Sequence, residues 1–228
     1  MPKSILIVTH CWAEQLPHYA AFLRYQLESL AHCPSSPEVA VCFSVRDKLT
    51  CDVMQEFASR LTIHSYALAS DELGRRSIGR NLAAHDCQTS LVWFTDVDYL
   101  FGRGCLTTLA SLQWSDQWSM VYPRSILINR THAIGDRYAM RRCKIDPDDF
   151  ETKVYSRAIG GVQIVQGDIA RRYGYLDGKN RWQQPVEKPF GDFKDDLAFR
   201  GRMAELGEIE PILLPNLYRL RHSTTTYQ

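Results

Sequence analysis

Three short runs of apolar residues in the first hundred positions constrain the fold more than any other feature of this chain. The runs are SILIVT (4–9), EVAVCFS (38–44) and SLVWFT (90–95), and each is apolar at most of its positions. Continuous apolar runs of this length are typical of strands in a parallel sheet that is covered on both faces. We therefore expect a central sheet with helices on either side.

Segments with the apolar spacing of helices separate these runs. Further helices are expected at about 52–60 and 76–88, with a short strand at 61–66 between them. This alternation over about residues 1–100 predicts a Rossmann-like α/β half with a mainly parallel sheet flanked by helices. The first helix carries one apolar stripe, formed by Tyr19, Phe22, Leu23, Leu27 and Leu30.

The pattern of residues 101–228 is less regular, and a polar loop is expected to continue to about residue 158. We take residues 1–228 as one domain whose second half has an irregular architecture. The elements expected in that half are strands at 118–123, 125–130 and 208–215, a mixed strand, turn and short-helix segment at 158–178, and a helix at 195–207 that Gly207 caps.

Length, charge and cysteine usage exclude several classes of protein. The 228 residues suffice for one large domain, and a formal net charge of +1 gives no reason to expect a nucleic-acid partner. Seven cysteines without a CxxC pair argue against a zinc cluster or a disulfide framework and fit a reducing cytoplasm. Because no run approaches the ~20 apolar residues of a membrane span, we expect a cytoplasmic protein without an integral membrane segment. Peripheral membrane contact stays open.

Two aspartates stand directly after the apolar run at 90–95. Asp96 and Asp98 are two positions apart, so in extended backbone their side chains point the same way. Oxygen ligands arranged in this way suit Mg²⁺ or Mn²⁺, particularly where phosphate oxygens complete the coordination. The alternative is structural, with Asp98 capping the next turn and Asp96 binding backbone amides.

Three further features accompany these acids. Arg75, Arg76 and Arg80 lie on the preceding helix, and the arginine fork matches two oxygens of a diphosphate. A solvated helix face is the alternative for these arginines. Asp195 and Asp196 open a later helix, where acids also serve as caps, and His222 follows the last expected strand. A lone histidine of this kind is more often structural or exposed than a ligand.

Taken in this order, the motifs resemble glycosyltransferase family 2 and its relatives with the GT-A fold. The resemblance covers most of the chain, from Ile5 to about His222. Its motifs are GRNLA (79–83), WFTDVDY (93–99), the pair Gly160 and Gly161, the helix segment DDLAFRGRMAELG (195–207), and the final pair Pro215 and His222.

The resemblance implies a GT-A fold and a donor site for a nucleotide diphosphate sugar, for which we expect a UDP-sugar. It also implies a cation, Mn²⁺ or Mg²⁺, with the histidine favouring Mn²⁺. Asp96, Asp98 and His222 are its expected ligands. Base recognition is left with Asp47 alone in FSVRDKLT (43–50). The residues expected to bind the donor are Thr9, Asp47, Arg76, Arg80, Asn81 and Asp96.

The resemblance further implies an inverting transfer to an acceptor hydroxyl. Asp196 takes the role of the general base and Asp195 stands where the family has a glutamate. An alternative register pairs Asp196 and Arg200 with the family's later acid and arginine, leaving Lys194 at the base position, and Asp192 is an outside candidate. On the acceptor side we expect Gly160, Gly161 and Trp182, with a glycan, a glycolipid or another hydroxyl compound as acceptor. The basic segment 137–144 is either a contact for an anionic acceptor or a solvated face.

Two other functions compete with a glycosyltransferase. A nucleotidyltransferase of related α/β fold would need a glycine-rich basic loop after the first strand, and THCWAEQLPHY (9–19) has none. A GT-A-like domain that binds sugars without turnover would have no need of a base at Asp196. A phosphatase of the haloacid-dehalogenase type would carry its acids after the first strand, whereas here they follow about the fourth.

Overall fold

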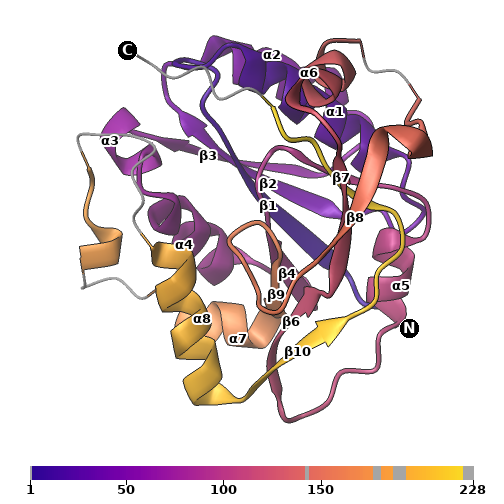
Figure 1. Ribbon diagram of the computed structural model, residues 1–228. Helices are drawn as coiled ribbons and strands as arrows, with labels where there is room; N and C mark the ends of the chain where they lie inside the picture. Colours follow the sequence, from indigo (N-terminus) through magenta and orange to yellow (C-terminus); the bar gives the residue numbers. More distant parts are fainter. Residues whose placement is uncertain (1, 142–143, 177–180, 187–193, 223–228) are drawn as a thin grey trace.

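The computed structural model describes residues 2–141, 144–176, 181–186 and 194–222. These residues form a central sheet of seven strands with helices on both faces (Figure 1). The strands run in the order β10 (Glu208–Ile212), β6 (Trp118–Pro123), β9 (Gln163–Gln166), β4 (Leu91–Phe94), β1 (Ile5–Cys11), β2 (Glu38–Ser44) and β3 (Ile63–Leu68).

The first half of this sheet confirms the predicted parallel arrangement. Strand β1 pairs in parallel with β2 on one side and with β4 on the other, and β2 continues in parallel to β3. Every residue of β1 and β4 is buried, as expected for strands covered on both faces. The sheet is mainly parallel rather than wholly so, because β9 runs antiparallel between β4 and β6.

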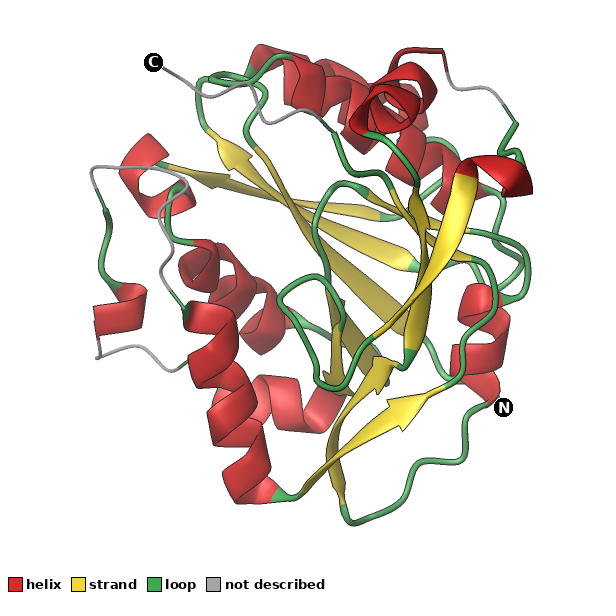
Figure 2. Ribbon diagram, viewed as in Figure 1, coloured by secondary structure: helices red, strands yellow, loops and turns green. Residues whose placement is uncertain are grey.

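Helices cover both faces of the sheet (Figure 2). One apolar core contains residues of α1, α2 and α5, and the other contains residues of α3, α4, α7 and α8. The helices are α1 (His18–Ala31), α2 (Lys48–Phe57), α3 (Ser70–Leu73), α4 (Arg76–Asp86), α5 (Cys105–Ser111), α6 (His132–Arg141), α7 (Gly167–Tyr173) and α8 (Asp195–Leu206), with 3₁₀ turns at η1 (Pro147–Asp149) and η2 (Arg181–Gln183).

Helix α2 begins four residues earlier than the predicted segment at 52–60. The reason is a capping interaction that hydrophobic spacing does not reveal. Asp47 is the N-cap, and its carboxylate accepts hydrogen bonds from the Thr50 backbone N–H at 3.0 Å and the Thr50 hydroxyl at 2.7 Å.

A second, smaller sheet corrects the expectation of a polar loop that continues to residue 158. Helix α6 and strand β8 both form within that stretch. Strand β8 is an edge strand in which Phe150 is buried and the following four residues are exposed, so it lacks the alternation of a half-buried strand. The strands of this sheet run in the order β5 (Tyr99–Phe101), β11 (Leu217–Arg219), β7 (Ser125–Asn129) and β8 (Phe150–Val154).

The strand order places a topological switch point between β1 and β4. The connections from β1 proceed outward to β2 and β3, and the chain then returns to add β4 on the other side of β1. Ligands of open α/β sheets bind beyond the carboxyl ends of the strands at such a point. Asp96 and Asp98 lie in the short connection between β4 and β5, at this edge of the sheet. Within the described part of the chain, no helix is long and apolar enough to cross a membrane.

Candidate active site

Arginines neutralise both acids of the connection between β4 and β5. The Asp96 carboxylate accepts hydrogen bonds from Arg76 at 2.9 Å and from Arg80 at 3.2 Å. Asp98 accepts one from Nε of Arg219, on β11, at 3.0 Å. Two guanidinium groups therefore contact Asp96, and a third contacts Asp98. Sequence analysis had identified Arg76 and Arg80 but not Arg219.

The two carboxylates differ in their electrostatics. Burial acts to raise the pKa of Asp96, but the charges of Arg76 and Arg80 outweigh it and hold that pKa below the usual aspartate value. Burial raises the pKa of Asp98 above its usual value, even though Arg219 opposes the shift. The two arginines thus keep Asp96 ionised. Burial makes the ionised form of Asp98 less favourable.

Helix α4 positions the two arginines that meet Asp96. Arg76 is its first residue and Arg80 follows four positions later, so both side chains lie on one face. Arg80 is fully buried and also donates to the backbone oxygen of Thr95 at 3.2 Å. Gly79 lets α4 pack closely against β1 and β2, because a Cβ there would lie 2.6 Å from Sγ of Cys42 and 2.7 Å from Nε2 of His10.

Gly160 and Gly161 lie where Asp196, on α8, and Asp96, after β4, approach the same backbone segment. A Cβ placed on Gly160 would lie 3.2 Å from Cβ of Asp196, and one placed on Gly161 would lie 3.0 Å from Oδ2 of Asp96. The absence of side chains at these two adjacent positions lets Asp96 and Asp196 approach the same short backbone segment. The structure thus brings together motifs that are about one hundred positions apart in the sequence.

The two aspartates at the start of α8 point to different partners. Asp195 is buried, and its Oδ2 accepts a hydrogen bond from the Ser77 backbone N–H at 3.2 Å, in the first turn of α4. Asp196 is half-buried beside Gly160. Lys194, the N-cap residue, has a φ of +54°, a left-handed conformation that is uncommon for residues other than glycine. Asp195 therefore joins two helix starts, and Asp196 is the more accessible carboxylate.

Sequence analysis missed two polar residues that connect α4 to α8. The Tyr175 hydroxyl accepts a hydrogen bond from Arg80 at 2.9 Å and donates one to Oε1 of Gln163 at 2.7 Å. Nε2 of Gln163 then donates to the backbone oxygen of Asp196 at 2.9 Å. Burial raises the pKa of Tyr175, so its hydroxyl stays protonated. The sequence signal that could have revealed this connection is Gln163, a polar residue within the otherwise apolar segment VQIV.

His222 and Asp98 each carry a buried donor atom that a divalent cation could use. Nδ1 of His222 and Oδ1 of Asp98 are both buried and have no hydrogen-bond partner. The His222 ring packs against Phe22, with ring centroids 4.7 Å apart, and lies near His18. Among the described residues, no group of three or more His, Cys, Asp or Glu side chains could hold a metal. The expected ligands Asp96, Asp98 and His222 thus do not form a complete metal site, and a cation held by Asp98 and His222 would need its other ligands from a phosphate-bearing substrate or from water.

Several of the other expected donor residues make structural contacts. Asp47 caps α2 through Thr50, as described above. Oδ1 of Asn81 accepts a hydrogen bond from the Tyr175 backbone N–H at 3.0 Å, which ties α4 to the segment after α7. Thr9 is buried in β1, and its hydroxyl has no hydrogen-bond partner.

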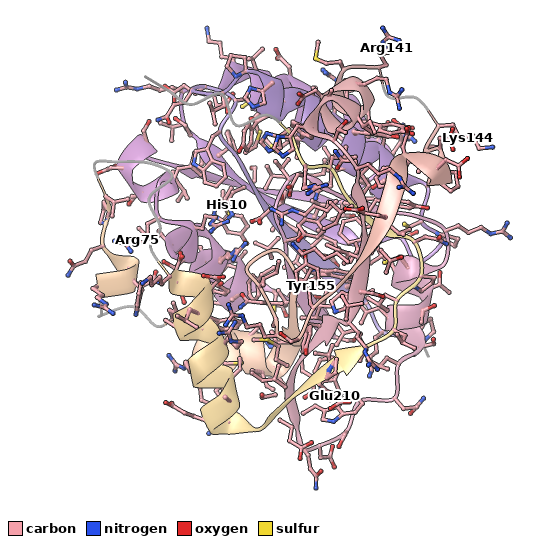
Figure 3. The ribbon with its side chains drawn as sticks, viewed as in Figure 1. His10, Arg75, Arg141, Lys144, Tyr155 and Glu210 are labelled. Atoms are coloured by element: carbon pink, nitrogen blue, oxygen red, sulfur yellow. The ribbon has the colours of Figure 1, made fainter. Side chains whose placement is uncertain are left out.

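The expected acceptor-side residues lie on two sides of the molecule. Trp182 lies in η2, where Arg75 and Arg181 approach its ring at 5.9 and 4.4 Å from the centroid. Arg141 and Lys144 of the basic segment 137–144 lie at the outer edge of the molecule, away from His10 and Arg75 (Figure 3). Asp192 lies outside the described residues.

His10 is a further buried residue that sequence analysis missed. It belongs to β1, is 1% exposed and has no well-aligned partner for either ring nitrogen. Burial, with the positive charges of Arg80 and Arg76, lowers the pKa of His10 well below the usual histidine value, against the opposing effect of Asp96. His10 is therefore neutral and lies against α4, where a Cβ placed on Gly79 would be 2.7 Å from its Nε2.

The mainly parallel sheet flanked by helices has a GT-A type architecture, in agreement with solved structures. No protein-family model matches the sequence, and no curated protein matches it. S. aureus TarS 1–349 in complex with UDP-GlcNAc matches with a TM-score of 0.66 and 12% identity, over 99% of this chain and 62% of that chain. The mannosyltransferase PcManGT from Pyrobaculum calidifontis, in complex with GDP-Man and Mn²⁺, matches with a TM-score of 0.61 and 13% identity, over 100% of this chain and 59% of that chain. This chain thus spans about three fifths of the length of these matched chains, and at such identities the likeness shows the fold alone.

Proposed function

We propose that this protein is a glycosyltransferase that moves a sugar from a nucleotide diphosphate sugar to an acceptor hydroxyl. One observation carries the proposal: Asp96 and Asp196 meet at adjacent residues, Gly161 and Gly160. A transferase needs donor-binding groups and a base on opposite sides of one reacting carbon. The two glycines carry no side chain that would separate these carboxylates, which supports a shared site for donor and acceptor.

Asp196 is the proposed general base. It accepts the proton of the acceptor hydroxyl while that oxygen forms its bond to the anomeric carbon. The bond from this carbon to the diphosphate breaks in the same step, and the leaving oxygen keeps the electron pair. Attack opposite the leaving group inverts the configuration at the anomeric carbon. Asp195 supports this role by fixing the start of α8 against α4.

The arginines of α4 are the proposed electrostatic partners of the leaving diphosphate. Arg76 and Arg80 both donate to the Asp96 carboxylate, which holds their positive charges in fixed positions. Charge that develops on the diphosphate as the bond breaks is stabilised by such preorganised groups. Arg76 is 33% exposed on its side chain and can reach a ligand, whereas Arg80 at 1% acts from within the protein.

Asp98 and His222 are the proposed cation-binding residues, with Asp96 beside them. A bound divalent ion supplies Lewis-acid stabilisation of phosphate charge. The imidazole donor favours Mn²⁺ over Mg²⁺, which prefers oxygen ligands and water. The solved complex of PcManGT holds Mn²⁺ with GDP-Man, and solved complexes of TarS hold UDP or UDP-GlcNAc. We take a UDP-sugar as the donor, and a glycan, a glycolipid or another hydroxyl compound as the acceptor.

A thermal-shift screen of UDP- and GDP-sugars, with Mn²⁺ or with EDTA, tests the proposal. We expect one nucleotide class to raise the Tm with Mn²⁺, and the same donor to release nucleoside diphosphate in a hydrolysis assay. Asp98→Ala should lose the Mn²⁺-dependent part of the Tm shift, whereas Asp52→Ala, which changes an exposed acid of α2, should keep it. Release that continues undiminished in EDTA would exclude the cation. Stabilisation by free sugars without nucleotide or turnover would identify a sugar-binding domain instead.

A further inference from the structure

Arg219 occupies a position that sequence analysis assigned to no ligand. Its Nε donates to Oδ2 of Asp98 at 3.0 Å, and its guanidinium carbon lies 5.4 Å from the Tyr99 ring centroid. The pairing of β11 with β5 sets Arg219 directly opposite Tyr99. The backbone N–H of Leu220 also donates to the Asp98 backbone oxygen at 2.8 Å. Main-chain hydrogen bonds therefore hold this guanidinium next to Asp98.

Only one of the two Asp98 carboxylate oxygens has a hydrogen-bond partner. Oδ2 faces Arg219, while Oδ1 is buried without a hydrogen-bond partner. A cation that approached Oδ1 would meet the positive charge of Arg219 across the same carboxylate. The second carboxylate of the pair offers no compensation, because Asp96 already has Arg76 and Arg80 as partners. Because the Asp98 side chain is only 8% exposed, repulsion between charges on either side of it is stronger than in bulk solvent.

A bound diphosphate would offset the repulsion between the cation and Arg219. It brings negative oxygens that can accept hydrogen bonds from a guanidinium and ligate a cation at the same time. The Arg219 side chain is 31% exposed, so such a ligand can reach it, while the Asp98 side chain is only 8% exposed.

We propose that Arg219 is an internal counter-cation of Asp98 that prevents a divalent cation from binding alone and contributes to binding of the donor diphosphate. The cation then enters together with the nucleotide and not before it. This inference rests on the proposed function, since it specifies how the same site is loaded. In this proposal Arg219 binds the donor, and its charge is the reason why the cation and the nucleotide bind together.

The test compares Arg219→Gln with Arg219→Lys, which keeps the charge, and with Arg103→Gln, which removes an exposed arginine elsewhere. Mn²⁺ binding is measured by electron paramagnetic resonance with the metal alone, and UDP and GDP binding by calorimetry in EDTA. For Arg219→Gln we expect Mn²⁺ alone to bind roughly tenfold more tightly, and the preferred nucleotide to bind roughly tenfold more weakly without metal. The Lys variant and Arg103→Gln should resemble wild type in the Mn²⁺ titration.

Circular dichroism and a Tm for each variant establish that the compared proteins are folded. If folded Arg219→Gln binds Mn²⁺ no more tightly than wild type does, the counter-cation role is wrong. Should Arg219→Gln unfold, the Lys variant decides: wild-type nucleotide affinity with weak binding of Mn²⁺ alone supports the role of charge, and tight binding of Mn²⁺ alone contradicts it. Failure of the wild type to bind any nucleoside diphosphate would instead overturn the proposed function, and the Mn²⁺ comparison would still judge Arg219.

Discussion

Arg80 and Tyr175 form a buried pair in which Nη1 of the arginine donates to the tyrosine hydroxyl at 2.9 Å. The guanidinium carbon also lies 5.0 Å from the centroid of the same ring. Because that hydroxyl passes a hydrogen bond on to Gln163, and Gln163 to the Asp196 backbone, the pair connects the proposed diphosphate side of the site with the proposed base.

Tyr175→Phe should therefore affect both stability and turnover. The change leaves one donor of Arg80 and Oε1 of Gln163 without their partner in a dry environment. Stability should fall by about 1–3 kcal/mol, the cost of unsatisfied buried groups. We also expect a lower kcat, since the start of α8 loses one of its constraints. Urea denaturation and donor hydrolysis measure the two effects. Tyr173→Phe, at a half-buried ring on α7, is the matched control.

The adjacent glycines should respond differently to the same substitution. A Cβ at Gly161 would clash with the Tyr99 ring, at 2.9 Å from Cζ, whereas at Gly160 the nearest atom is 3.2 Å away. Gly161→Ala should cost about 1–3 kcal/mol, as overpacking does. Gly160→Ala should fold with a smaller loss and reduce turnover, because the new methyl group lies against Asp196.

Gly201→Ala is the control for both glycine variants. Gly201 lies within α8, and no atom is within 4 Å of the position its Cβ would take. Alanine in an open helix position should raise stability by about 0.5–1 kcal/mol. Chemical denaturation of the three variants gives the comparison. Equal losses for Gly160→Ala and Gly161→Ala would contradict the close contact with Tyr99.

Substitution of the two aspartates at the start of α8 should have different effects, on stability for Asp195 and on turnover for Asp196. Asp195→Asn removes a charge that faces the first turn of α4 and should cost roughly 0.3–1 kcal/mol of stability. Asp196→Asn should leave stability nearly unchanged and lower kcat by about 10²–10⁴-fold, with donor affinity retained. Denaturation, donor titration and steady-state kinetics check the two variants. Near wild-type turnover of Asp196→Asn would remove this residue from the role of base and return attention to Asp195.

The sequence predicted the parallel strands and the order of the motifs for a physical reason. Strands buried on both faces must be apolar throughout, TDVD adjoins such a strand, and GRNLA lies in the helix before it, so local patterns were enough. The residues that it did not reveal act through long-range pairing. Arg219 faces Asp98 only because a three-residue strand, β11, pairs with the equally short β5. Strands of three residues carry no readable periodicity.

Residues with two plausible roles were also beyond the reach of sequence patterns. Asp195 and Asp196 are neighbours of the same type, and only packing shows that the first binds the Ser77 backbone. Asp47 follows a strand end, where a ligand-binding acid and a helix cap look alike, and the structure makes it a cap. The choice depends on which atoms of distant segments arrive nearby.

His10 leads to a prediction for the pH dependence of stability. Its pKa is lowered well below the usual histidine value in the folded protein, because of burial and the charges of Arg80 and Arg76. The unfolded chain takes up this proton near the ordinary value of about 6.5, while the folded protein does not. Wild-type stability should therefore fall as the pH decreases from 6.5 to 5, by up to about 1.4 kcal/mol per pH unit from this residue alone.

His10→Gln should remove this contribution, because glutamine does not titrate. Its stability curve should be flatter than that of wild type below pH 6.5, while the slopes of the two proteins agree above pH 7.5. His64→Gln, which changes an exposed histidine paired with Glu38, should keep more of the wild-type slope. Urea denaturation at half-unit intervals from pH 5 to 8 gives the comparison. Parallel curves for wild type and His10→Gln below pH 6.5 would mean that the folded protein protonates His10, and that burial and the charges of Arg80 and Arg76 do not keep the ring neutral.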